Sequence, residues 1–311
     1  MVYMYKIIKL ISRIYCYFYV YIFADRVIGI YPDIKAKKNR VNLFDYHPEL
    51  SERRENLYNN SRWNLGDSLG FVVTSYMLEK KGLSLNTWVK KRKHFGSIGS
   101  YVFTSFQHLT IWGGGLLCPP ETGNVKYRIL SILFRYPFSK YDFRAVRGPL
   151  TREIVLKYGH KCPEVYGDPA ILMPYIYSPK REVKHDFLVI PQYYTESEFR
   201  LKYPNMNTLS MNTDDYKQVI DAIMSSKKVI TSSLHGIILA EAYGVPVVFF
   251  RGLEQRIDFK YLDYFYSTGR KEIQIANSFE EALKMEPLPL PDLKSLQEGL
   301  LNSFPYDLWE K

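Results

Sequence analysis

The segment at residues 228–251, KVITSSLHGIILAEAYGVPVVFFR, constrains the fold more than any other part of this chain. Residues 229–231 favour a strand, two serines that commonly cap helices follow, and Gly244 stands where a helix usually ends before a second strand at 245–250. His235 then falls in the first helical turn at the carboxyl end of a parallel strand, where backbone N–H groups and the helix dipole favour an anion. The spacing alone leaves a second interpretation open, in which His235 only satisfies backbone groups at a tight turn.

Strand, glycine turn and helix alternate along the rest of the chain as well. Strands are predicted at residues 41–44, 109–112, 143–146 and 187–190, and helices at residues 68–81, 150–158, 195–203 and 214–225. This alternation predicts an α/β fold with doubly wound parallel sheets, which bind ligands beyond the carboxyl ends of their strands.

Two breaks divide the pattern into domains. The stretch PYIYSPKREVKHD at 174–186 combines prolines with charges and has neither a helix nor a strand period, which predicts a linker. A second break, EPLPLP at 286–291, precedes a predicted terminal helix at 292–301. The predicted organisation is an N-terminal segment at 1–40, one Rossmann-like domain at 41–178, a second at 179–285, and a helical tail at 286–311.

The amino-acid composition limits which binding partners and which cellular compartment are expected. The net charge of +10 indicates acidic ligands or an anionic membrane surface, and its dispersal without a recognition motif argues against nucleic acid. The 27 tyrosines suit sugar stacking, but a coding bias explains them equally well. The three cysteines are too far apart for a disulfide framework or a CxxC motif, and the six histidines include no i, i+4 pair. We therefore expect a cytoplasmic protein without a metal site.

The amino-terminal residues 7–23, IIKLISRIYCYFYVYIF, are apolar and aromatic but include Lys9 and Arg13. The stretch is at the lower length limit for a membrane span and lacks a signal-peptide cleavage site. Two interpretations stay open. The segment is an interfacial helix on anionic lipid at the inner face of the membrane, or it is a buried or partner-facing helix of a soluble enzyme.

Six short motifs occur in the same order as in polysaccharide pyruvyl transferases. They are Asn64-Leu65-Gly66-Asp67, the glycines 113–115 after Trp112, Val146-Arg147-Gly148-Pro149-Leu150-Thr151, Tyr166-Gly167-Asp168-Pro169-Ala170, Ser232-Ser233-Leu234-His235-Gly236, and Asp263-Tyr264-Phe265 with Gly269-Arg270. The chain resembles this family over about residues 41 to 275. The resemblance implies a GT-B-like fold, with two Rossmann-like domains facing a cleft. The apolar and basic helix expected near the N-terminus precedes these domains.

The resemblance also implies a reaction. A pyruvyl group passes from phosphoenolpyruvate, a co-substrate, to a sugar of a surface polysaccharide of the cell envelope or to its lipid-linked precursor, and it ends as a cyclic ketal. No cofactor is implied. The chemistry needs an acid, a base and several cations.

Individual residues receive roles from the same resemblance. His235 and Asp67 are the expected catalytic residues, and His235 is expected to supply or relay a proton. Donor or substrate contacts are expected at Asn64, Gly113, Gly114, Arg147, Asp168, Ser233, Leu234, Arg251 and Arg270. The Arg147 guanidinium suits a two-pronged grip on a carboxylate or phosphate, with a surface ion pair as the alternative.

Simpler roles stay open for several of these residues. Asp67 is alternatively the N-cap of a helix, and Asp168 alternatively serves a turn. The glycines at 113–115 indicate a close backbone approach, either to a ligand or to a neighbouring helix.

Two positions depart from the family pattern. Many relatives carry Arg where Ser233 stands and Pro-His where Pro191-Gln192 stands. Arg251, Lys260 and Arg270 are candidates to replace the missing positive charge. Two other functions therefore stay open: a glycosyltransferase with a nucleotide-sugar donor, and a non-catalytic sugar-binding or assembly protein.

Overall fold

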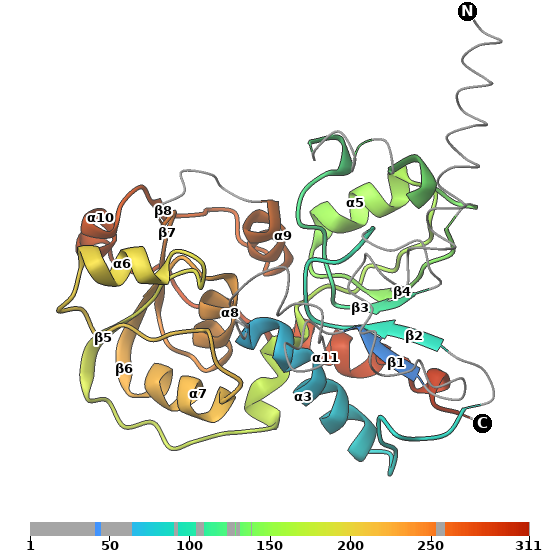
Figure 1. Cartoon of the computed structure of the whole chain (residues 1–311), viewed down its shortest axis with the longest axis horizontal. Coiled ribbons are helices and arrows are strands. Elements are labelled where there is room, and N and C mark those ends of the chain that lie inside the picture. The colour runs from blue at the N-terminus through green and yellow to red at the C-terminus, as the bar shows by residue number, and fades with distance from the viewer. Residues whose placement is uncertain are drawn as a thin grey trace, which may run out of the picture.

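The computed structural model describes residues 41–44, 64–89, 93–103, 109–122, 128, 131–137, 139–252 and 259–310, without the side chains of residues 42–44, 67 and 93. The segment at 7–23 lies outside the described residues. Within them, the strands form two four-stranded sheets in which every pairing is parallel, as predicted (Figure 1).

The first sheet has the strand order β1-β2-β3-β4. Its strands are β1 (Val41–Phe44), β2 (Lys93–Gly96), β3 (Thr110–Trp112) and β4 (Asp142–Ala145), its helices are α3 (Leu65–Glu79) and α5 (Pro149–Lys157), and two short 3₁₀ turns are η2 (Pro120–Thr122) and η3 (Ser131–Phe134). Proline suits the start of α5, because the N–H that it lacks has no partner within the helix at that position.

The second sheet has the order β5-β6-β7-β8. Its strands are β5 (His185–Ile190), β6 (Ser226–Thr231), β7 (Val247–Phe250) and β8 (Ile275–Ala276), and its helices are α6 (Glu196–Lys202), α7 (Tyr216–Met224), α8 (Leu234–Ala242), α9 (Phe259–Ser267) and α10 (Phe279–Lys284). The β6-α8-β7 unit is the one predicted from residues 228–251. Ser233 caps α8, and Gly244 adopts a φ of +69° just after it.

Three contacts join the elements of the two sheets. The 3₁₀ segment η4 (Pro169–Tyr175) packs against both α3 and α8, and α5 packs against α9. Helix α11 (Lys294–Ser303) and η5 (Tyr306–Leu308) carry the chain back to the first sheet, where the Trp112 indole N–H donates to the Leu300 carbonyl (3.0 Å). The division into domains and the cleft between them stay predictions.

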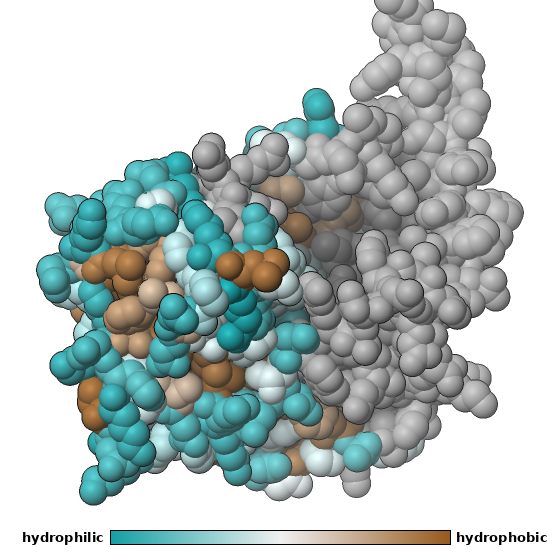
Figure 2. Space-filling view, turned by 60° about the vertical axis from the view of Figure 1, so that its left-hand side comes forward, coloured by the Kyte–Doolittle hydropathy of each residue, from teal (hydrophilic) through white to brown (hydrophobic). Residues whose placement is uncertain are grey.

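Helix faces explain where the core lies. The side chains of Val219, Ile220 and Ile223 on α7 are buried, because their spacing places them on one face of the helix. Figure 2 shows hydrophilic side chains over most of the coloured surface on the side of the second sheet, with apolar side chains in small groups between them. The second sheet is therefore buried under helices whose polar faces point outward.

The start of α3 corrects one prediction. Asn64 is the N-cap residue, with extended backbone, and its carbonyl accepts the Ser68 N–H (3.1 Å). Asp67 is therefore the third residue of the helix, and the interpretation of Asp67 as the cap was wrong. The helix begins three residues earlier than predicted because the Asn-Leu-Gly-Asp motif already belongs to its first turn.

Candidate active site

The turn between β6 and α8 fixes the position of His235. The Thr231 hydroxyl donates to the Ile190 carbonyl (2.6 Å) and accepts the Ser233 N–H (2.9 Å), and Ser233 Oγ accepts the Gly236 N–H (3.4 Å). A Cβ on Gly236 would come within 2.4 Å of Thr231 Oγ1, so this close turn requires glycine. His235 consequently lies in the first turn of α8, at the carboxyl end of β6, as the sequence predicted.

The His235 imidazole packs directly against the first turn of α3. A Cβ on Gly66 would lie 1.8 Å from His235 Nδ1, which leaves no room for a side chain at residue 66. The first turns of α3 and α8 therefore meet at this histidine, and both helices lie near the middle of the molecule in Figure 1. The first N–H groups of a helix have no partner within the helix and carry its positive dipole end, so two such ends together favour an anion.

Asp168 is the carboxylate nearest to His235 in the described part of the chain. Its Oδ2 lies 3.8 Å from His235 Nε2, and its Oδ1 accepts the Ala170 N–H (3.0 Å) at the start of η4. The side chains of His235 and Asp168 are 13% and 2% exposed. Asp168 is therefore both the cap of η4 and a buried neighbour of the histidine.

Burial sets the protonation of this pair. Burial, together with the smaller effects of the positive charges of Lys260 and Arg147, lowers the pKa of His235 to about 3. Burial raises the pKa of Asp168 to about 6, against the effects of the Ala170 hydrogen bond and of Arg147. At neutral pH the site accordingly holds a neutral imidazole next to a carboxylate.

Arg147 has protein partners on every side in this structure and is 1% exposed. Its Nη1 donates to Ser100 Oγ (2.9 Å), its Nη2 donates to the Leu116 carbonyl (2.6 Å), and its Nε lies 3.2 Å from Asp263 Oδ2. The Nε contact is an ion pair without hydrogen-bond alignment. The alternative of a surface ion pair was wrong, because the pair is buried, and a direct contact of Arg147 with the donor stays a prediction.

The glycines after β3 approach other parts of the chain. A Cβ on Gly113 would lie 2.3 Å from Pro169 Cδ, and one on Gly114 would lie 2.3 Å from the Tyr101 hydroxyl. Gly113 also has a φ of +84°, which favours glycine. Packing within the protein is thus sufficient to explain both glycines, and their contact with a substrate stays a prediction.

Other predicted site residues surround the meeting point of α3 and α8. Asn64 and Ser233 are the N-caps of these helices, Leu234 is 7% exposed, and the backbone of Asp67 lies in the first turn of α3. The side chain of Asp67 lies outside the described residues, so its catalytic role stays a prediction.

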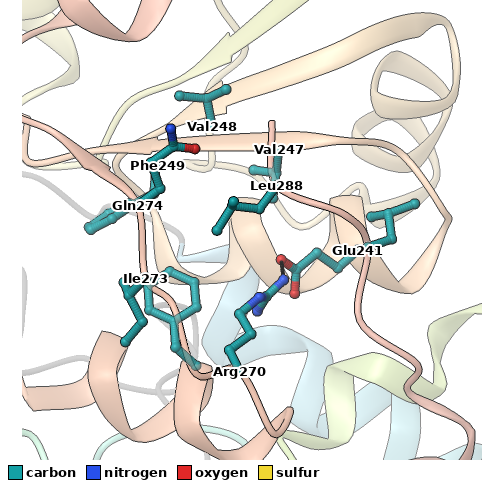
Figure 3. Close-up of a pocket in the computed structure, with 10 residues that line it drawn as sticks. Glu241, Val247, Val248, Phe249, Arg270, Ile273, Gln274 and Leu288 are labelled. Carbon is teal, nitrogen blue, oxygen red and sulfur yellow. Dashed lines mark hydrogen bonds and ion pairs between the residues drawn. The ribbon is translucent and has the colours of Figure 1, made fainter. Parts of the chain in front are cut away.

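Arg270 lies at the opposite end of α8. It pairs with the buried Glu241, six residues after His235, and six helical residues span about 9 Å. Both side chains line a pocket with apolar walls from β7 and from Leu288, as Figure 3 shows. The structure therefore does not bring Arg270 next to His235.

Two further cations differ in their relation to the histidine. Lys260, on α9, is close enough to lower the pKa of His235. Arg251 follows β7, and its buried Nε has no hydrogen-bond partner among the described residues.

The loop after β5 supplies residues that the sequence reasoning did not assign. The Gln192 N–H donates to Ser232 Oγ (3.0 Å), and the Gln192 side chain donates to the Tyr261 hydroxyl (2.5 Å), which in turn donates to the Ser232 carbonyl (2.7 Å). Tyr193 and Tyr194 follow directly, are 38% and 40% exposed, and pack edge to face. The sequence feature that pointed to this loop was Pro191-Gln192, which by itself indicates only a departure from the family pattern.

A family model gives the chain its identity. The model described as polysaccharide pyruvyl transferase matches residues 27–252, which include β1 through β7. The chain belongs to this family. As a polysaccharide pyruvyl transferase family member it is a transferase, and the matched region contains Gly66, Asp168 and His235.

Two similar proteins are themselves without an assigned function. An uncharacterized protein of Acanthamoeba polyphaga mimivirus is 25% identical over 213 residues, which cover 65% of this chain and 69% of that protein. A crystal structure of a functionally uncharacterized Klebsiella pneumoniae protein shares 13% identity and covers 66% of this chain and 84% of its own, with a TM-score of 0.41.

Proposed function

We propose that this polysaccharide pyruvyl transferase moves the pyruvyl group of phosphoenolpyruvate to a sugar of a surface polysaccharide or its lipid-linked precursor, as a cyclic ketal. The observation that carries the proposal is the meeting of two helix N-termini at His235. Phosphoenolpyruvate carries a phosphate and a carboxylate, and each of these anions suits the positive end of a helix dipole.

The reaction sets chemical demands that the site can meet. One sugar hydroxyl adds to C2 of the donor while C3 gains a proton, and loss of phosphate then lets a second hydroxyl close the ketal. His235 is neutral at neutral pH and so can accept a proton before it donates one. Lys260 adds a positive charge on the α9 side of the histidine, in a region where Ser233 replaces the arginine of many relatives.

The two tyrosines of the loop after β5 support the part of the proposal that concerns the sugar acceptor. Gln192 bonds to Ser232, three residues before His235, so Tyr193 and Tyr194 lie at the same edge of the second sheet as the histidine. Tyrosine rings present flat apolar faces with a polar tip, a combination that suits the faces and hydroxyls of a sugar. We expect Tyr193→Ala to raise the acceptor KM by about tenfold, or about 1.4 kcal/mol, and to leave the donor KM unchanged.

A donor assay tests the proposed function. Purified protein is incubated with an acceptor glycan and either phosphoenolpyruvate or nucleotide sugars, and phosphate release is measured beside product mass. Phosphate release with addition of a pyruvyl group supports the proposal. Release of a nucleotide would identify a glycosyltransferase, and neither activity across an acceptor panel would favour a sugar-binding or assembly protein.

Two histidine variants give this assay a matched control. His235→Asn removes the imidazole at the carboxyl edge of the second sheet, whereas His185→Asn changes an exposed histidine at the start of β5, at the opposite edge. We expect a loss of at least two tenfold steps in kcat, about 2.7 kcal/mol, for His235→Asn only.

A peripheral membrane location at the cytoplasmic face is part of the proposal. Among the described residues no helix is long and apolar enough to cross a membrane. Residues 7–23 carry Lys9 and Arg13 among aromatic residues, a composition that suits anionic lipid. The double variant Lys9→Glu, Arg13→Glu should sediment less with anionic vesicles than the unchanged chain, and equal sedimentation of both would reject the location.

A further inference from the structure

The two nitrogens of the His235 ring have different surroundings. Nε2 is buried, has no hydrogen-bond partner among the described residues, and lies 3.8 Å from Asp168 Oδ2. Nδ1 faces Gly66, at the meeting point of the two helix N-termini. Because Nε2 is enclosed, Nδ1 is the nitrogen that remains for a proton of the substrate.

The Asp168 carboxylate is divided between two tasks. Oδ1 accepts the Ala170 N–H (3.0 Å), and this bond holds the carboxylate at the start of η4. Oδ2 faces the histidine, and η4 packs against α8. The orientation of Asp168 toward Nε2 is therefore fixed by the chain itself.

We propose that Asp168 is a positioning residue for His235: its Oδ2 accepts the Nε2 proton, which leaves the Nδ1 lone pair free to receive a proton from the substrate. This inference rests on the pyruvyl transfer proposed above. The separation of 3.8 Å is longer than a hydrogen bond, and such contacts commonly shorten when a substrate binds.

The proton transfer balances within one addition step. As the sugar oxygen attacks C2 of phosphoenolpyruvate, its O–H bond breaks, the proton moves to the Nδ1 lone pair, and the electron pair of the C2–C3 double bond moves to C3. The imidazolium then gives this proton to C3, which becomes a methyl group, and His235 is neutral again. The Asp168 carboxylate stabilises the short-lived imidazolium next to it.

The charges around the pair favour this assignment. With a pKa of about 6 for Asp168 and about 3 for His235, neutral pH gives a carboxylate and a neutral base. The other groups that interact with the pair are Lys260 from α9, Arg147 from the turn after β4 and the buried phenols of Tyr101 and Tyr264, with the Asp67 side chain outside the described residues. We expect kcat to fall as the pH drops through about 6, because protonation of Asp168 removes the acceptor for Nε2–H.

Asp168→Asn tests the inference with little change of shape. Because the Ala170 N–H holds Oδ1, the new amide nitrogen takes the place of Oδ2 and donates to Nε2, so the ring proton must move to Nδ1. We expect kcat to fall by about 100-fold or more while the KM for phosphoenolpyruvate stays within about threefold. Asp215→Asn is the matched control, since Asp215 caps α7 through Gln218 N–H at the same 3.0 Å and should leave kcat unchanged.

A measurement without turnover separates this inference from the proposed function. ¹⁵N NMR of the full chain, with the His235 signals assigned through His235→Gln, reports which ring nitrogen carries the proton. We expect Nε2–H in the unchanged chain and Nδ1–H in Asp168→Asn. If phosphoenolpyruvate is not the donor, the tautomer result still stands. The same tautomer in both proteins, or an unchanged kcat in Asp168→Asn, would overturn the inference.

Discussion

Two buried pairs of ionisable side chains lie close together in this protein and differ in how completely their atoms are paired. The Arg147 guanidinium donates hydrogen bonds to Ser100 and Leu116, and its Nε, which has no aligned hydrogen bond, forms an ion pair with Asp263 at 3.2 Å. Both oxygens of Asp263 also accept hydrogen bonds from Thr151. His235 Nε2, in contrast, has only Asp168 at 3.8 Å. An unsatisfied buried polar atom is unfavourable, so its persistence points to a contact with Asp168 that is completed when the substrate binds. The comparison assigns the first pair to the scaffold and the second to the chemistry.

The largest expected effect comes from breaking the Arg147–Asp263 pair, the more completely paired of the two. Arg147→Ala leaves the buried Asp263 carboxylate without its cation and should lower the free energy of unfolding by about 3–5 kcal/mol. Arg144→Ala is the control, because Arg144 pairs with Asp307 at the surface and should lower it by about 1 kcal/mol or less. Urea denaturation measures both.

Arg147→Lys sharpens this test. Lysine keeps the charge but loses the planar fork, so the scaffold assignment predicts reduced stability. A weaker apparent donor affinity with an unchanged free energy of unfolding would contradict that assignment and place the guanidinium on the donor.

The pH dependence of the free energy of unfolding should report the shifted pKa values of the His235–Asp168 pair. Between about pH 6 and 4 the folded protein keeps Asp168 protonated and His235 neutral, whereas the unfolded chain does the reverse. The stability that Asp168 contributes is lost as pH rises through about 6. The stability that His235 contributes is lost as pH falls toward about 3. Between these values the two contributions to the pH dependence of the free energy of unfolding have opposite signs and offset each other.

Asp168→Asn removes the contribution of Asp168 to the pH dependence of the free energy of unfolding and leaves that of His235. Relative to the unchanged chain, the variant should lose about 1.4 kcal/mol of stability per pH unit on acidification from pH 6 to 4, about 3 kcal/mol in all. Urea denaturation at several pH values measures this difference. Parallel pH profiles for the two proteins would mean that the pair is not coupled to folding as described.

Gly66→Ala tests the His235–Asp168 pair from the side of His235 Nδ1. Its Cβ would lie 1.8 Å from His235 Nδ1, so the imidazole must move, and kcat should fall by about 100-fold, or about 2.7 kcal/mol. Gly299→Ala on α11 is the control, since its Cβ would meet Val165 at an ordinary 3.4 Å. Added to His235→Ala, Gly66→Ala should cost no further activity, and additive losses would show that Gly66 acts apart from the histidine.

The smallest expected effect on activity concerns the third buried pair. Arg270 is paired with Glu241, which also accepts the Tyr264 hydroxyl, at the far end of α8. Arg270→Gln should change kcat/KM for the donor by no more than about threefold, although it destabilises the fold. A large rise in the donor KM with unchanged stability would show that the Figure 3 pocket binds the donor.

The sequence predicted the parts of the fold that have clear periods. The β6-α8-β7 unit followed from one capping serine, one terminating glycine and two apolar strands. Helix α9, FKYLDYFYS, had no predicted counterpart because its aromatic residues favour strands, and its helix is stabilised by tertiary packing of Tyr261, Tyr264 and Phe265. Strand β8 has two residues and carries no period at all.

The site was predictable only in part, for a physical reason. Helix-start geometry is local, so the sequence placed His235 correctly. The contacts of His235 with Gly66 and Asp168 join residues far apart in the chain, and no local pattern encodes which carboxylate faces which nitrogen. The burial of Arg147 was hidden for the same reason, because Asp263 lies on α9, an element that had no predicted counterpart.

A crystal structure with phosphoenolpyruvate soaked in tests the central claim most directly. The account predicts the donor anions at the meeting point of the α3 and α8 N-termini, with C3 within about 3.5 Å of His235 Nδ1 and with Nε2 within hydrogen-bond distance of Asp168. Donor bound in the pocket of Arg270 and Glu241, with His235 unchanged and remote, would contradict it.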